Sequence, residues 1–88
     1  MRKIVTVIKA FTLNHNVFVY DENEVIDIVQ ASMNDLENVI LSTAEEYDIQ
    51  DVTLVGPKKF SAGIKARIQT AEMSKYNCNK LNIEIRAN

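Results

Sequence analysis

Side chains able to do acid–base or metal chemistry are few and scattered in this 88-residue sequence. Carboxylates hold a divalent metal ion when several of them converge, and an imidazole titrates near neutral pH. The single histidine lies in the run Asn14-His15-Asn16, which is typical of an exposed turn. Four aspartates fall at expected strand ends or turns, where solvation is the usual reason for them: Asp21, Asp27, Asp48 and Asp51. We therefore expect no catalytic residue and no metal site.

The one cysteine, Cys78, stands between two asparagines with no histidine near it in the sequence. A surface or half-buried thiol is expected there rather than a nucleophile. A single cysteine excludes an internal disulfide and any paired-cysteine metal site, which fits a reducing, cytoplasmic compartment. The run Gly56-Pro57-Lys58-Lys59 lacks the spacing and the second glycine of a phosphate-binding loop. No cofactor is expected.

Four cations gather near the beginning of the second expected helix, where unpaired backbone N–H groups attract anions. Such a cluster is a candidate site for a phosphate or a carboxylate, although a solvated basic loop is the more common interpretation. Phe60 either stacks on a base or packs on Ile64 as a hydrophobic staple. The candidate anion-binding or nucleic-acid-binding residues are Lys58, Lys59, Lys65 and Arg67.

Composition indicates one ordinary globular domain over residues 1–88, with 47% hydrophobic and 25% charged residues. The formal net charge of −2 argues against general, salt-driven binding of nucleic acid, though not against a local basic patch. The first apolar run is interrupted by Thr6 and Lys9, so it predicts neither a signal peptide nor a membrane span. Richness in Ile, Asn and Lys is typical of an AT-rich genome, and short proteins of this kind are common in phages and mobile elements.

The first part of the chain predicts three strands. Residues 3–13 are rich in β-branched and aromatic side chains and predict the first strand, which ends at a turn over residues 14–16. Residues 17–20 predict the second strand, antiparallel to the first. A further turn at residues 21–23 leads to a third strand over residues 24–30.

The second part predicts two helices and two strands. Ser32 or Asn34 is expected to cap the first helix, and Ser61 the second. Residues 52–55 predict a buried strand between the helices, residues 76–79 a loop, and alternation over residues 81–86 a final strand with one wet face. The apolar faces of the helices are expected at Leu36, Val39, Ile40, Thr43, Ala44 and Tyr47, and at Ile64, Ile68 and Ala71.

The resulting order is β-β-β-α-β-α-β, an α/β domain. Right-handed crossovers joining the last strands place both helices on one face of a mixed sheet. Apolar side chains occur at both odd and even positions of the first strands, so one apolar set is left without a cover. This open face is the expected protein interface, through either the Phe18 and Tyr20 set or the Val17 and Val19 set.

The order of elements resembles the ribonuclease-H-like fold, which implies a five-stranded sheet arranged 3-2-1-4-5. Short motifs are similar to those of small-subunit platform ribosomal proteins with that fold. They are Ala10-Phe11-Thr12-Leu13-Asn14, the strand from Val17 to Asp21, and Gly56-Pro57 followed by Ile64-Lys65-Ala66. The residues after the Gly-Pro pair, Lys58-Lys59-Phe60-Ser61, differ from the family pattern, and the basic C-terminal tail is not found.

Nucleases of the ribonuclease-H-like fold hold two metal ions on carboxylates, one of which comes from the first strand. Residues 3–13 contain no Asp or Glu, so a nuclease is not expected. The favoured hypothesis is a small non-catalytic module that binds a protein, or a second copy of itself, through the open sheet face. The alternatives are a nucleic-acid-binding module that uses the basic start of the second helix, and an enzyme that borrows catalytic groups from a partner.

Overall fold

The computed structural model describes the backbone of residues 1–75 and 81–87, and the side chains of residues 1–71 and 81–87. The expected order of elements is confirmed. The elements are β1 (Arg2–Val7), β2 (Asn14–Asp21), β3 (Glu24–Ser32), a 3-10 turn η1 (Met33–Asp35), α1 (Leu36–Tyr47), β4 (Asp51–Val55), α2 (Lys58–Lys75) and β5 (Asn82–Arg86).

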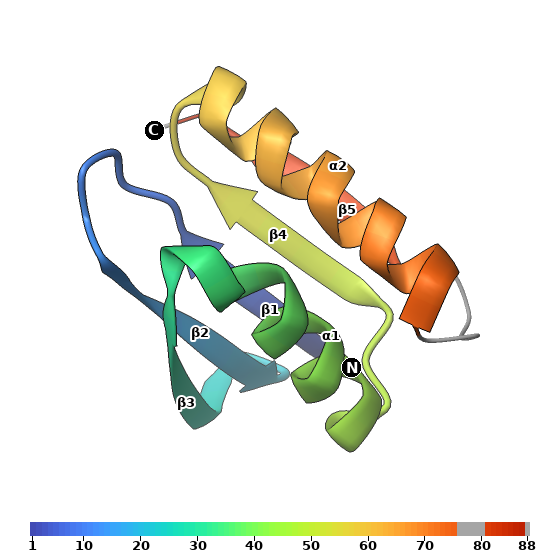
Figure 1. Ribbon diagram of the computed structural model, residues 1–88. Helices are drawn as coiled ribbons and strands as arrows, with labels where there is room; N and C mark the ends of the chain where they lie inside the picture. Colours follow the sequence, from blue (N-terminus) through green and yellow to red (C-terminus); the bar gives the residue numbers. More distant parts are fainter. Residues whose placement is uncertain (76–80, 88) are drawn as a thin grey trace.

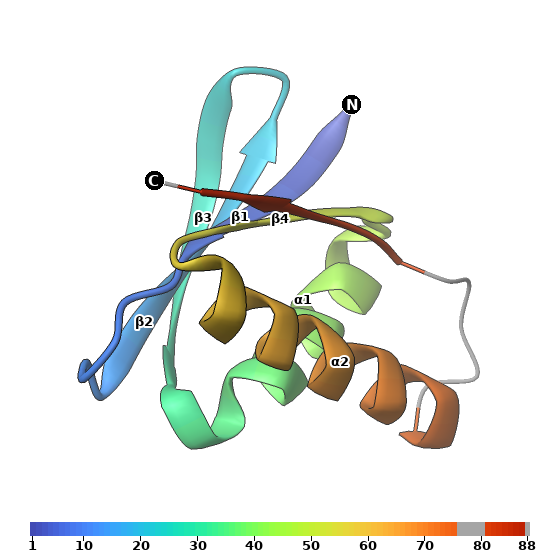
Figure 2. The same ribbon diagram turned by 90° about the horizontal axis from the view of Figure 1, so that it is seen from above.

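The five strands form one mixed sheet in the order β3-β2-β1-β4-β5 (Figure 1). β1 pairs antiparallel with β2 and parallel with β4, while β5 extends the parallel part. Both helices lie on the same side of the sheet, and the β2–β3 hairpin rises on the other side (Figure 2). The predicted sheet order and the placement of both helices on one face are therefore confirmed.

The hydrophobic core lies between the sheet and the two helices. Ile4 of β1 and Ile8, the residue after β1, are fully buried in it, and so is Leu54 of β4. The predicted apolar faces of the helices supply the other wall, because Ile40 and Ile68 are also fully buried. Burying a side chain of this size stabilises the fold by about 1.5–3 kcal/mol.

The first strand ends earlier than predicted. β1 stops at Val7, residues 8–13 form a loop, and the segment predicted as a turn, residues 14–16, already belongs to β2. Phe11 has a φ of 61° and is fully exposed, so the chain reverses at this residue. The Ile8 N–H still donates to the Val55 carbonyl at 2.6 Å, while the Leu13 carbonyl accepts from Met33 N–H at 2.9 Å. These two bonds hold one end of the loop at β4 and the other end at η1. One continuous strand over residues 3–13 is therefore not formed.

The caps of both helices also differ from the prediction. α2 begins at Lys58, directly after Pro57, so Ser61 lies inside the helix and is fully buried. Its N–H donates to the Pro57 carbonyl at 2.9 Å in the first turn. Neither Ser32 nor Asn34 caps α1, since η1 intervenes and Asp35 stands at the N-cap. The Asp35 side chain makes no capping bond and instead accepts from Asn38 Nδ2 at 3.0 Å. The loop predicted at residues 76–79 lies outside the described residues, as does Cys78.

The two glycines provide a test of this packing. A Cβ atom added at Gly56 would lie 2.4 Å from the Ile8 carbonyl oxygen, whereas one added at Gly63 would have no atom of the described residues within 4 Å, its own helix backbone and chain neighbours aside. We expect Gly56→Ala to destabilise the fold by about 1–3 kcal/mol through overpacking. Gly63→Ala is the matched control and should stabilise it by about 0.5–1 kcal/mol, because alanine favours the helix.

Urea denaturation of both variants measures these changes. Equal stabilities for Gly56→Ala and the unsubstituted chain would contradict the close approach of β1 to the β4–α2 turn.

Candidate interaction surface

Neither helix covers the face of the sheet that is turned away from them (Figure 2). Side chains alternate between the two faces of a strand, and paired residues point to the same side. In β1 the buried residues Ile4 and Thr6 face the helices, so Lys3, Val5 and Val7 face outward. The pairing register extends this open face across the other four strands.

An apolar band crosses the open face obliquely. Its middle row runs from Ile28 through Phe18 to Val5, which are paired across β3, β2 and β1. The row before it pairs Val25 with Tyr20, and the row after it pairs Val7 with Val55. Ile28 is 55% exposed and Val25 41%, and the other members are half-buried. The apolar band consists of Val5, Val7, Phe18, Tyr20, Val25, Ile28 and Val55.

Two polar regions flank the apolar band. The amide corner, over β2 and β3, contains Asn14, Asn16 and Gln30. The charged corner, over β1, β4 and β5, contains Lys3, Asp51 and Glu84.

The charges on this face are largely satisfied within the chain. Lys3 Nζ lies 5.6 Å from the centre of the Tyr20 ring. Asn82 Nδ2 donates to Asp51 Oδ1 at 3.3 Å, and Arg86 Nε pairs with Glu84 Oε1 at 3.1 Å. Two cations and two anions balance one another, so the open face offers little net attraction to a polyanion.

The structure separates the four predicted interface residues into two pairs. Phe18 and Tyr20 lie on the open face, as one of the two predicted sets required. Val17 and Val19 are fully buried beneath the helices and cannot contact a partner, so this set is wrong. The sequence did not indicate which set faces the helices, because both are apolar. The sequence analysis did not predict three further residues of this face, Val5, Val7 and Ile28. The available signal was the alternation of side chains along each strand, which puts every second residue on the same face.

The outer edge of β3 is protected against pairing with another strand. Asp27 Oδ1 accepts the N–H of Ile28 at 2.8 Å, which occupies a backbone donor in the middle of this edge strand. The register shifts between Val19 and Tyr20, so β3 carries an irregularity near the same place. Edge strands commonly use inward charges and bulges in this way to avoid edge-to-edge association. The face of the sheet is therefore better suited to contact than its β3 edge.

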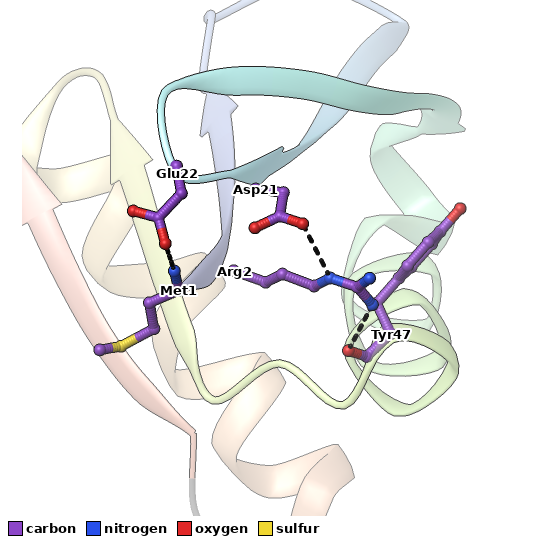
Figure 3. A network of polar contacts seen from close by, with 5 residues as sticks. All are labelled: Met1, Arg2, Asp21, Glu22 and Tyr47. Carbon is purple, nitrogen blue, oxygen red and sulfur yellow. Dashed lines mark hydrogen bonds and ion pairs between the residues drawn. The ribbon is translucent and has the colours of Figure 1, made fainter.

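A polar network closes the end of the core where β1 begins (Figure 3). The Arg2 guanidinium lies 3.6 Å from Asp21 Oδ2, donates to the Tyr47 carbonyl at 3.5 Å and stands over the Tyr47 ring. The Tyr47 hydroxyl donates to Asp27 Oδ2 at 2.6 Å, and the Met1 amino group contacts the Glu22 carboxylate. The hydrogen bond to Asp27, followed by desolvation, raises the pKa of Tyr47 above its ordinary value. The network fixes the C-terminal end of α1 to β1, β2 and β3.

The four predicted anion-binding cations do not converge. Arg67 donates to both carboxylate oxygens of Glu37, at 2.8 and 3.0 Å, and so joins α2 to α1. Lys58 and Lys65 are seven residues apart and lie on one side of α2, whereas Arg67 lies about 180° around the helix from Lys58. Lys58 and Lys59 are exposed. The structure thus brings Lys58 near Lys59 and Lys65 but places Arg67 elsewhere.

The sequence analysis also did not predict a group of exposed side chains in the loop after β1, at the end of the sheet where β1, β4 and β5 finish. Gly56 N–H donates to the Arg86 carbonyl at 2.9 Å and Gly56 packs against Ile8, so the ends of β1, β4 and β5 are adjacent. The loop after β1 carries Lys9, Phe11 and Leu13, and the last two are 103% and 82% exposed. The start of α2 with Lys58 and Lys59 therefore shares one end of the molecule with an exposed aromatic loop.

His15 was expected in an exposed turn, and that expectation is wrong. Its side chain is only 3% exposed, because β2 already includes residue 15 and turns it toward the covered face. Nε2 lies 3.3 Å from both the backbone nitrogen and the carbonyl oxygen of Lys9, while Nδ1 has no hydrogen-bond partner among the described residues. His15 thus holds the base of the loop after β1.

The aspartates are dispersed among strand ends, turns and the Tyr47 network. Within the described part of the chain, no three His, Cys, Asp or Glu side chains are grouped as metal ligands would be. In that same part, neither helix combines the length and apolar character that crossing a bilayer requires.

Comparisons with known proteins inform the fold alone. No protein-family model matches the sequence, and no curated protein matches it. Among solved structures, the chain is similar to a Bacteroides thetaiotaomicron protein with an actin-like ATPase fold and unknown function, with a TM-score of 0.63 and 6% identity. The match covers 99% of this chain and 32% of that protein. The actin-like ATPase fold is related to the ribonuclease-H-like class, which agrees with the 3-2-1-4-5 sheet.

The raised pKa of Tyr47 yields a prediction about stability at high pH. A group whose pKa is raised on folding contributes stability that is present below its unfolded pKa of about 10 and lost as the pH rises through its folded pKa. We expect the unsubstituted chain to lose stability above about pH 10 more steeply than Tyr47→Phe does. Urea denaturation at several pH values measures this, and absorbance titration of both proteins assigns the late-ionising tyrosine. Identical pH profiles would contradict the Tyr47–Asp27 bond.

Proposed function

We propose that this protein is a small non-catalytic module that binds another protein surface through the open face of its sheet. The observation that supports the proposal is the apolar band, which contains two aromatic rings and is covered by neither helix. Aromatic side chains at the centre of a patch are the usual anchors of protein interfaces, and a polar rim excludes water around them. The amide corner and the charged corner supply such a rim.

The site offers recognition rather than chemistry. The carboxylates on the open face, Asp51 and Glu84, each contact a neighbouring polar side chain of the same sheet. His15 is buried and bonded to the Lys9 backbone rather than presented at a surface. A module of this kind acts by bringing surfaces together, and its specificity resides in shape and in the two flanking corners.

A charge placed in the apolar band tests the proposal. Phe18→Lys should reduce partner capture about tenfold or more, because a buried interface core excludes an unpaired ammonium. Asn16→Lys adds the same charge on the same strand but outside the band, and it is the matched control. The measurement is capture of partners from lysate of the source organism by immobilised protein, together with light scattering of the purified chain.

Both variants must retain the urea midpoint of the unsubstituted chain, since Phe18 and Asn16 lie outside the core. Equal capture by Phe18→Lys and by the unsubstituted chain would refute the open face as the binding surface.

One observation favours a second candidate function, which is binding of nucleic acid at the end of the sheet where β1, β4 and β5 finish. Lys58 and Lys59 share that end with Lys9 and with the exposed ring of Phe11. Cations that contact phosphates, with an aromatic ring on which a base stacks, are the elements of single-strand binding. Lys65 and Arg67 contribute less to this candidate, because Arg67 is paired with Glu37.

Charge reversal tests the second candidate. If the chain binds a single-stranded oligonucleotide at this end, Lys58→Glu with Lys59→Glu should weaken binding strongly, and the slope of log affinity against log salt should become shallower by about 0.7 per lost phosphate contact. Fluorescence anisotropy measures both quantities, and Arg67→Glu is the control because it lies on the other side of α2. Absence of binding at low salt by the unsubstituted chain would exclude this function.

A further inference from the structure

The end of the molecule at which β1 and β4 finish presents apolar side chains to solvent. Phe11 and Leu13, in the loop after β1, are almost completely exposed, and Phe60 in the first turn of α2 is half-exposed. This loop and the start of α2 lie at the same end of the molecule, the one toward which the β4 arrow points (Figure 1). Apolar groups gathered on an exposed end mark contact with a protein or with a membrane.

The loop after β1 is fixed at both ends and directs Phe11 outward. Its first end is held by the bond from Ile8 N–H to the Val55 carbonyl at 2.6 Å, and its last end by the bond from Met33 N–H to the Leu13 carbonyl at 2.9 Å. Phe11 has a φ of 61°, which is strained for a residue with a side chain, and its ring is nevertheless left in solvent. A side chain presented in this way loses little conformational freedom on binding.

Three lysines accompany these apolar side chains. Lys9 belongs to the same loop, and Lys58 and Lys59 begin α2. All three are exposed, and none of them forms an ion pair with another described residue. No Asp or Glu occurs within residues 3–20 or 52–71, the two segments that build most of this end. The end is therefore both apolar and positively charged.

Carboxylates collect at the other end of the strands. In the pairing register, Asp21 and Asp51 lie opposite the first residues of β1. β1 has 6 residues, about 20 Å, which exceeds the Debye length of about 8 Å at physiological salt. A negative surface at the basic end is therefore screened from this acidic end. Asp35 of η1 is nearer to the loop, and it accepts a hydrogen bond from Asn38 Nδ2 at 3.0 Å.

We propose that this basic end binds the surface of an anionic lipid bilayer. Phe11 and Leu13 enter the boundary between headgroups and acyl chains, and Lys9, Lys58 and Lys59 lie against the anionic headgroups. The chain then lies on the bilayer and does not cross it. The inference goes beyond the proposed function, because it assigns a ligand to a surface separate from the apolar band.

Two features favour a bilayer over a nucleic acid at this end. Leu13 is aliphatic and offers no ring on which a base stacks, whereas the acyl-chain boundary takes up any apolar side chain. Phe11 is fully exposed on a loop rather than set in a groove, and single strands follow basic grooves. A soft lipid layer accepts such a projecting side chain.

Tryptophan fluorescence tests insertion, because the chain contains no tryptophan. Phe11→Trp places an indole in the loop, and Asn23→Trp places one in the exposed β2–β3 turn at the acidic end as the matched control. Vesicles of phosphatidylcholine with about 30% phosphatidylserine should move the emission of Phe11→Trp to shorter wavelength and leave that of Asn23→Trp unchanged. Vesicles of phosphatidylcholine alone should have a much smaller effect.

Co-sedimentation with the same vesicles measures each contribution. Phe11→Asn keeps the loop, because asparagine tolerates a positive φ, and should lower the partition coefficient at least about tenfold. Lys58→Gln with Lys59→Gln should lower it about 25-fold, since each lysine at an anionic surface contributes about fivefold. Arg67→Gln is the charge control and should retain binding, because Arg67 is paired with Glu37 on another side of α2.

The outcomes decide between a bilayer and the alternatives. Loss of vesicle binding by Phe11→Asn and by the double lysine variant, at unchanged urea midpoints, supports the inference. No binding to anionic vesicles at low salt overturns it, and so does binding that neither Phe11→Asn nor Leu13→Asn weakens. Binding of a single-stranded oligonucleotide without binding of vesicles overturns it and leaves the second candidate function for this end. Since the apolar band takes no part, these results are independent of partner capture by the open face.

Discussion

The alternation of side chains along β1 and β2 is the constraint on which the rest of this structure depends. Both helices cover one face, so each strand residue is assigned either to the core or to the open face by its parity alone. Ile4 and Val19, which are paired, are fully buried, while the neighbouring pair Val5 and Phe18 faces the other way. Since both sets are apolar, the sheet stabilises the fold with one face and keeps a hydrophobic surface on the other.

Much of the fold follows from local sequence signals. The type of each strand or helix and the apolar faces around Ile40 and Ile68 are encoded by periodicity within one segment. The placement of both helices on one face follows from the general preference for right-handed crossovers. The sheet order 3-2-1-4-5 was instead implied by the resemblance to the ribonuclease-H-like fold. Agreement between these signals explains why the architecture can be predicted from this sequence, although a protein that shares it is only 6% identical.

The structure differs from the predictions where contacts between residues far apart in the sequence determine the local conformation. Phe11 and Thr12 have high strand propensity, yet the chain turns there because Leu13 bonds to Met33 and Ile8 bonds to Val55. Ser61 has the chemistry of an N-cap, but α2 already begins at Lys58, directly after Pro57. The choice between Phe18 with Tyr20 and Val17 with Val19 depended on which face the helices cover, and no property of β2 alone contains that information.

The bond between Asp27 and the N–H of Ile28 has a consequence for behaviour at high concentration. Exposed β-branched residues on a long outer strand are the features from which amyloid grows, because each new chain adds backbone bonds to a free border. Here one carboxylate blocks that border and simultaneously binds Tyr47 of the first helix. Loss of the tyrosine bond would free the carboxylate to move, so the integrity of the helix layer and resistance to fibre formation are linked through a single residue.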